Sequence, residues 1–107
     1  MTSHLTTHIL NATSGSPAAG VAVRLLGPGG EEIARGRTDD DGRLGLGPKA
    51  LEQGHYSLVF DTGTYFAAQD AETFYPWVTV AFTVADRPHY HVPLLLSPFA
   101  YSTYRGS

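Results

Sequence analysis

The chain has no cysteine among its 107 residues, which excludes disulfide bonds, thiolate metal ligands and cysteine nucleophiles. Long apolar runs are also missing. The longest, at residues 92–96, has the length of a strand and not the roughly 20 residues of a membrane helix. Positive charge is scarce, because seven Lys and Arg stand against ten Asp and Glu for a net charge of −3. A phosphate backbone needs a basic surface, so we expect neither nucleic acid nor a membrane as a partner.

The sequence also lacks the features of a secretory signal. Residues 1–4, MTSH, carry no basic segment, and no long apolar segment follows them. Together with the lack of cysteine, this favours a cytoplasmic protein.

The composition is typical of one globular domain. Apolar residues make up 42% of the chain and charged residues 16%, a balance that disordered chains do not have. The length predicts a single domain over residues 1–107, large enough to bury one core.

Short runs with apolar residues at every second position are separated by turns rich in glycine and proline. This alternation predicts β-strands, which we expect at residues 6–10, 21–25, 32–38, 43–46, 55–61, 78–84, 89–97 and 101–105. One segment, residues 64–70, breaks the alternation and predicts a short helix. Eight short strands with at most one helix indicate an all-β sandwich.

The predicted strands have little protection against pairing with other chains. Exposed strand edges in monomers are usually guarded by lysine or proline, and the single lysine, Lys49, lies outside the strands. The last two strands also carry apolar or aromatic residues on both faces, such as Leu95 and Tyr101. We therefore expect another subunit to cover these edges.

Histidines are the first candidates for chemistry. His89 and His91 are two residues apart on a predicted strand, so their imidazoles project to the same side. The pair suits either a metal site, which needs a third ligand, or the pH-dependent or catalytic use of one imidazole. His8, alone on the first strand, suits a structural role or a site.

Arg43 and the end of the chain are the other candidates. Arg43 follows the acidic turn at residues 39–41, and it either pairs locally with those carboxylates or presents a cation to an anionic ligand. The last residues, 102–107, form a dense run of Tyr, Thr and Arg that ends in a serine. Such a run suits either a frayed tail or a site.

Several of these motifs together resemble the transthyretin-related family of 5-hydroxyisourate hydrolases. The likeness covers nearly the whole chain and rests on LTTHILN (5–11), GVAV (20–23), TDDDGR (38–43), YF (65–66), FYP (74–76), HYHVPLLLSP (89–98) and YRGS (104–107). The terminal YRGS with the upstream HYH is the most specific part, because the hormone-carrying transthyretins share the fold but lack these residues.

The resemblance implies a prealbumin-like sandwich of two four-stranded sheets and a homotetramer. The tetramer would be a dimer of dimers with sites at the dimer–dimer interface. It implies hydrolysis of 5-hydroxyisourate, the oxidation product of urate, to 2-oxo-4-hydroxy-4-carboxy-5-ureidoimidazoline, with no cofactor and no metal. The residues at the matching positions are His8, Arg43, His91 and Ser107 for catalysis, with Tyr104 and Arg105 for substrate binding. A carrier of the same fold, without catalysis, is the alternative.

Overall fold

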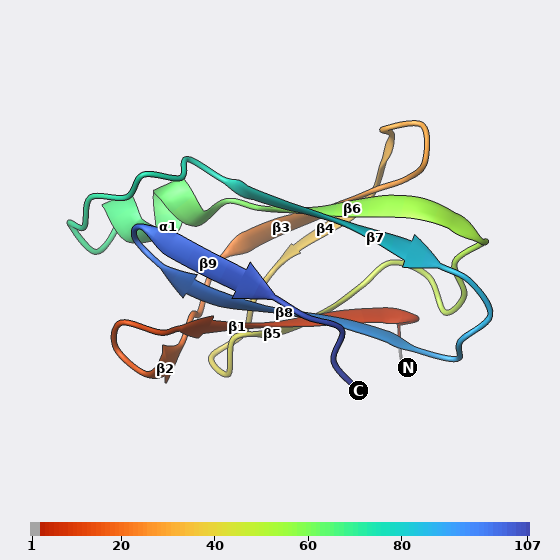
Figure 1. Cartoon of the computed structure of the whole chain (residues 1–107), viewed down its shortest axis with the longest axis horizontal. Coiled ribbons are helices and arrows are strands. Elements are labelled where there is room, and N and C mark those ends of the chain that lie inside the picture. Colours follow the sequence, from red (N-terminus) through yellow and green to blue (C-terminus); the bar gives the residue numbers. More distant parts are fainter. Residues whose placement is uncertain (1–2) are drawn as a thin grey trace.

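The computed structural model describes residues 3–107, and within them it contains two packed β-sheets and one short helix (Figure 1). The elements are β1 (Leu5–Asn11), β2 (Ser16–Pro17), β3 (Ala22–Leu26), β4 (Glu32–Arg37), β5 (Arg43–Leu46), β6 (Gly54–Phe60), α1 (Thr62–Ala67), β7 (Val78–Val84), β8 (Tyr90–Ser97) and β9 (Ala100–Thr103). The expected all-β sandwich with one helix is confirmed.

The first sheet is built around β1. Its order is β2-β1-β8-β9, and β5 pairs with the other end of β1 from β2. β1 and β8 run parallel, with Leu5 opposite Tyr90 and Asn11 opposite Leu96. We expected four strands here, and the structure has five because the two residues of β2 fold back onto the end of β1.

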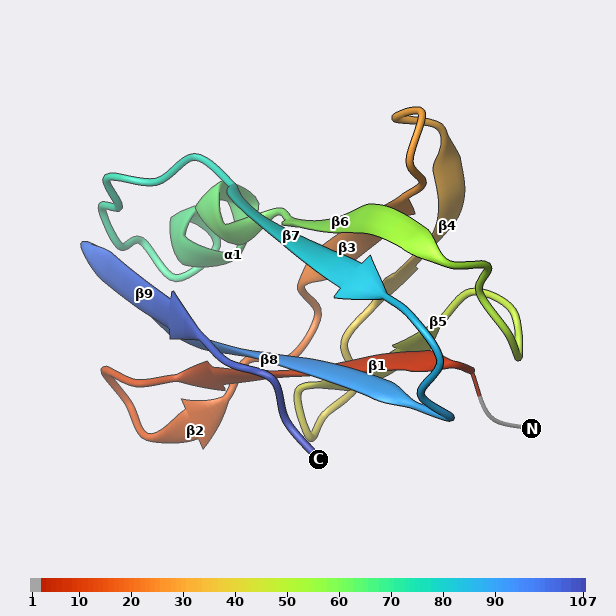
Figure 2. The same cartoon turned by 45° about the vertical axis from the view of Figure 1, so that its right-hand side comes forward.

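The second sheet has the expected four strands, in the order β4-β3-β6-β7, and all of its pairs are antiparallel. Figure 2 shows the two sheets as separate layers, with α1 at one end of the sandwich. Both views place the end of the chain on the side of the five-stranded sheet that faces away from its partner.

The core lies between the sheets and follows the predicted alternation. In β6, Tyr56, Leu58 and Phe60 are buried, and in β8 the same holds for Leu94 and Leu96. Each such side chain contributes about 1.5–3 kcal/mol by leaving water. The alternation has a consequence for function, because it turns the intervening residues of β1 and β8 to the outward face of the first sheet.

The helix and the last strand differ most from their predicted boundaries. The helix begins at Thr62, two residues before the predicted start, because the Asp61 carboxylate accepts a hydrogen bond from the backbone N–H of Thr64 and caps the first turn. It ends at Ala67 and not at residue 70. The last strand ends at Thr103 instead of residue 105, and the chain then continues alongside β8 to an isolated bridge between Gly106 and His91.

Candidate active site

Three of the candidate side chains, His8, Arg43 and His91, share the outward face of the five-stranded sheet with Thr6. In the ladders of β1, Thr6 lies opposite His91 of β8, and His8 lies opposite Arg43 of β5. Directly opposed residues project to the same face with their Cβ atoms about 4.5–5.5 Å apart. The sheet therefore places a guanidinium and two imidazoles close together, although they are up to 83 positions apart in the sequence.

The tail of the chain is fixed to the same place by its backbone. The N–H of Gly106 donates to the carbonyl of His91 at 2.8 Å, as a single bridge beyond the end of β9. A Cβ at position 106 would lie 2.5 Å from Cδ2 of the His91 ring, closer than any side chain tolerates. Glycine at this position lets the tail pass against the imidazole and places Ser107 beside it.

A groove of about 430 Å³ opens where these elements meet. Its lining includes Arg43, His91 and Ser107, together with Thr6 and Asp39. His8 is not among the lining residues, although it lies next to Arg43 in the ladder.

Tyr104 and Arg105 lie on the other side of His91. With His91 and residues of β7 they line a neighbouring groove of about 330 Å³. Five of the six predicted residues therefore line two grooves in the single chain, and His91 contributes to both, while His8 lies beside Arg43 in the ladder and lines neither groove.

His91 has the most perturbed environment of the candidates. Partial burial lowers the pKa of His91 below its ordinary value of 6.5, and the positive charge of Arg43 acts in the same direction. His8 and His89 add smaller contributions of the same sign, while a backbone hydrogen bond at Thr6 opposes them. The imidazole of His91 is therefore neutral at pH 7 and can accept a proton.

Arg43 is not occupied by the acidic turn that precedes it. The Asp39 carboxylate accepts hydrogen bonds from the backbone N–H groups of Asp41 (2.9 Å) and Arg43 (3.0 Å), which closes the turn. Among residues 3–107, no carboxylate lies within 4.0 Å of the Arg43 guanidinium. Its planar donors are left for an anionic or carbonyl group in the groove.

Sequence reasoning identified the histidine pair but missed Thr6, whose hydroxyl oxygen lies 2.8 Å from Nδ1 of His91 and 2.9 Å from Nε2 of His89. No local signal marks Thr6, because its contact with His91 depends on the parallel pairing of β1 with β8.

In the described part of the chain, no three His, Asp or Glu side chains converge as metal ligands do. No helix within residues 3–107 is long and apolar enough to cross a membrane.

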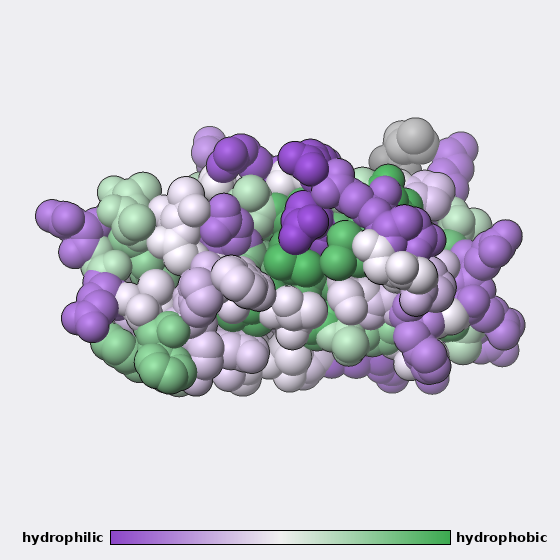
Figure 3. Space-filling view, turned by 90° about the horizontal axis from the view of Figure 1, so that it is seen from above, coloured by the Kyte–Doolittle hydropathy of each residue, from purple (hydrophilic) through white to green (hydrophobic). Residues whose placement is uncertain are grey.

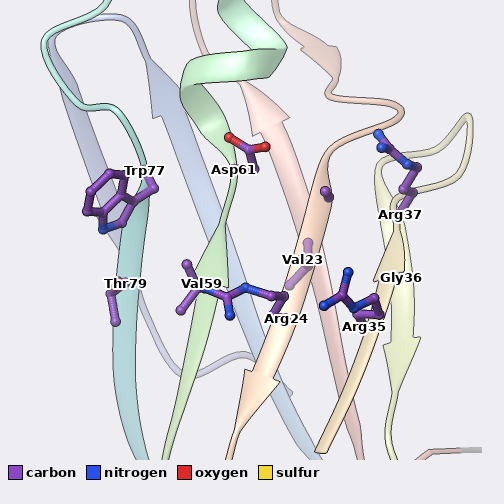
Figure 4. Close-up of a pocket in the computed structure, with 10 residues that line it drawn as sticks. Val23, Arg24, Arg35, Gly36, Arg37, Val59, Asp61, Trp77 and Thr79 are labelled. Atoms are coloured by element: carbon purple, nitrogen blue, oxygen red, sulfur yellow. The ribbon is translucent and has the colours of Figure 1, made fainter. Parts of the chain in front are cut away.

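A larger groove, of about 790 Å³, lies on the outer face of the other sheet. Figure 3 views the molecule from that side and shows apolar surface between hydrophilic side chains, and Figure 4 shows the residues that line the groove. Glu32 holds two of the arginines there, with an oxygen 2.7 Å from Nε of Arg35 and another 3.7 Å from Nη1 of Arg24. None of the six candidate residues lines this groove.

The fold and the site define a sandwich of the transthyretin type with a groove lined by histidine and arginine on the outward face of one sheet. The chain belongs to the HIUase/Transthyretin family, whose model matches residues 5–106. The predicted resemblance to this family is confirmed.

Individual relatives agree with this assignment over nearly the full chain. The chain is 46% identical to 5-hydroxyisourate hydrolase of Salmonella typhimurium, over 96% of this chain and 80% of that protein. The structure of Klebsiella pneumoniae 5-hydroxyisourate hydrolase matches with a TM-score of 0.89 and 39% identity, covering 98% of this chain and 94% of that one. Sea bream transthyretin in complex with thyroxine also matches with a TM-score of 0.89, at 32% identity, covering 96% and 94% of the two chains.

Proposed function

We propose that the chain is an enzyme that hydrolyses 5-hydroxyisourate to 2-oxo-4-hydroxy-4-carboxy-5-ureidoimidazoline. Relatives that are 44–46% identical to it over most of its length carry the name 5-hydroxyisourate hydrolase. The single observation that carries the proposal is the bridge from Gly106 to His91, because it brings Ser107 into one groove with Arg43 and His91.

In the proposed reaction, water adds to the ring carbonyl of an amide-like bond, and the C–N bond then breaks. The neutral imidazole of His91 takes the proton of the attacking water and returns it to the leaving nitrogen. His8, which lies beside Arg43 in the ladder and next to the groove lining of the single chain, helps to hold the water. No cofactor takes part, since the substrate is already electrophilic.

The other candidates bind and orient. The Arg43 guanidinium pairs with the substrate's carbonyl oxygens and stabilises the negative charge that develops as water adds. The hydroxyl groups of Ser107 and Tyr104 orient the ring or the water. Arg105 binds substrate from the neighbouring groove, which shares His91.

We further propose that the active form is a homotetramer, a dimer of dimers that completes each site at the dimer–dimer interface. Both grooves are open in the single chain, and Tyr104, Arg105 and Ser107 are exposed. Leu10 and Leu95 lie opposite each other on the outward face, where a partner subunit would cover them. A cytoplasmic location stays a prediction, which cell fractionation tests.

The proposal predicts that the protein speeds the ultraviolet decay of freshly generated 5-hydroxyisourate. The variants His91→Ala and Arg43→Ala should lower kcat/KM by about 10²-fold or more, the usual contribution of a general base or a charge-stabilising donor. Matched controls are His55→Ala, which removes an exposed histidine of β6, and Arg24→Ala, which removes an arginine of the other sheet. Both controls should keep wild-type activity.

The result that would contradict an enzymatic role is a wild-type protein that binds urate-like ligands but leaves the decay unchanged. That outcome would favour the carrier alternative, which the likeness to sea bream transthyretin raises. Wild-type turnover in the His91 and Arg43 variants would instead refute only their assigned roles.

A further inference from the structure

The hydroxyl of Thr6 lies between two imidazoles. Its oxygen is 2.8 Å from Nδ1 of His91 and 2.9 Å from Nε2 of His89. Both distances are those of good hydrogen bonds. The arrangement follows from the fold, because Thr6 lies opposite His91 in the parallel ladder and His89 is two residues before His91.

A hydroxyl has only one proton to donate, so Thr6 donates to one imidazole and accepts from the other. If His89 donates from Nε2, then Thr6 donates to Nδ1 of His91, and the proton of neutral His91 sits on its Nε2. If His91 donates from Nδ1, then Thr6 donates to Nε2 of His89, and Nε2 of His91 keeps a free lone pair. The tautomers of the two histidines are therefore coupled through Thr6.

Only the second arrangement makes His91 a base toward the groove. Within residues 3–107, Nε2 of His91 makes no hydrogen bond to protein, so it is the nitrogen left for water or substrate. A general base needs an unprotonated nitrogen at the position that faces the proton it removes.

The same contacts can carry charge away from His91. When Nε2 of His91 takes a proton from water, the proton on Nδ1 can pass to Thr6, and the hydroxyl proton of Thr6 can pass to Nε2 of His89. No proton is gained or lost in this transfer. It moves the positive charge from half-buried His91, beside Arg43, to His89, which is exposed to solvent. Charge is better solvated at the exposed position.

We propose that Thr6 and His89 are positioning residues of the active site, which hold His91 in the tautomer with a free Nε2 and share the proton that it removes from water. This proposal rests on the proposed hydrolytic function. The charged and titratable groups that face His91 or line its grooves are Arg37 of β4, Asp39 of the turn before β5, Arg43 of β5, His8 of β1, His89, Tyr90 of β8, and Tyr104, Arg105 and the Ser107 end of the tail.

The first test needs no substrate. Long-range ¹H–¹⁵N NMR of the imidazole rings in the free protein should find His91 protonated at Nδ1 and unprotonated at Nε2. In Thr6→Val, which removes the hydroxyl and keeps the side-chain shape, this tautomer should no longer dominate. Thr6→Ser, which keeps the hydroxyl, should restore it. An unchanged His91 tautomer in Thr6→Val would overturn the proposal.

The second test is kinetic. Thr6→Val should lower kcat by about 10- to 100-fold with KM changed less than about twofold, since a misplaced tautomer removes part of a general-base contribution. Thr6→Ser should stay within about twofold of wild type. In His89→Phe, the acid limb of the kcat/KM profile should move to higher pH, because His89 helps to lower the pKa of His91. A loss that came only from disturbed folding would not move this limb.

His89→Phe is the second variant because it should leave the fold intact, since His89 is exposed and precedes β8. If turnover is found but Thr6→Val leaves the His91 tautomer unchanged, or His89→Phe leaves the acid limb of the pH profile in place, the coupling is refuted. If the tautomer responds as expected but no variant, wild type included, hydrolyses 5-hydroxyisourate, the coupling stands and the proposed function fails.

Discussion

At the scale of single residues, the decisive property of the site is the protonation of His91. Burial and the nearby Arg43 lower the pKa of His91 below its ordinary value of 6.5. The imidazole in the folded protein therefore stays neutral as the pH falls from 7 toward 6.5. In the unfolded chain the same histidine takes up a proton near its ordinary pKa. The unfolded state therefore binds more protons between the two values, and His91 weakens the fold as the pH falls from 6.5 through its lowered pKa.

This predicts an NMR titration of the His91 ring with a midpoint below 6.5. In Arg43→Gln the midpoint should rise, because the second largest cause of the lowered pKa is removed. Arg24→Gln takes an arginine from the other sheet and should leave the midpoint unchanged. A wild-type midpoint at or above 6.5 would mean that His91 is not the neutral base the mechanism requires.

At the scale of elements, the tail is joined to β8 by a single bridge and ends against the ring of His91. Gly106→Ala would place a methyl group 2.5 Å from Cδ2 of His91, so the ring or the tail has to move. We expect kcat/KM to fall by about 10-fold or more, as for other losses of catalytic geometry. The free energy of unfolding should stay within about 0.5 kcal/mol, as for most surface changes. Removing residues 106–107 should abolish most activity with equally little loss of stability.

Gly29→Ala is the matched control for this prediction. The added Cβ would there meet only the flexible end of Glu31, at 3.0 Å, in an exposed turn. Its activity in the ultraviolet decay assay should equal that of the wild type. Full activity of the protein without residues 106–107 would show that the tail does not belong to the site.

The strands and the helix also differ in how well the sequence alone predicts them. Alternation is a local property of a half-buried strand, so the strands and the buried faces of β6 and β8 could be predicted. The two-residue β2 carries no such pattern, and α1 starts where Asp61 caps it. His8, Arg43, His91 and Ser107 were predicted through the family resemblance, and their catalytic roles stay predictions. The contact of Thr6 with His91 comes from pairing of β1 with β8, which no local pattern specifies.

At the scale of the whole molecule, the outward face of the β1–β8 ladder changes in character along its length. It begins with Thr6 beside His91 and ends with Leu10 beside Leu95. Both leucines point away from the core and are half-buried in the single chain. Apolar surface next to a polar groove is typical of a face that a partner covers, and the proposed dimer–dimer interface would cover it.

This arrangement predicts that light scattering finds about four times the chain mass of 11.5 kDa, and that Leu95→Glu dissociates the tetramer into dimers. Because Leu95 lies outside the core, the secondary structure should persist by circular dichroism, while kcat/KM falls as each site loses the wall that its partner supplies. Val59→Glu is the matched control, since Val59 is half-buried on the outer face of the other sheet. It should remain tetrameric and active. Full activity in a Leu95→Glu dimer would mean that each site is complete without the second dimer, and that the leucine pair serves another purpose.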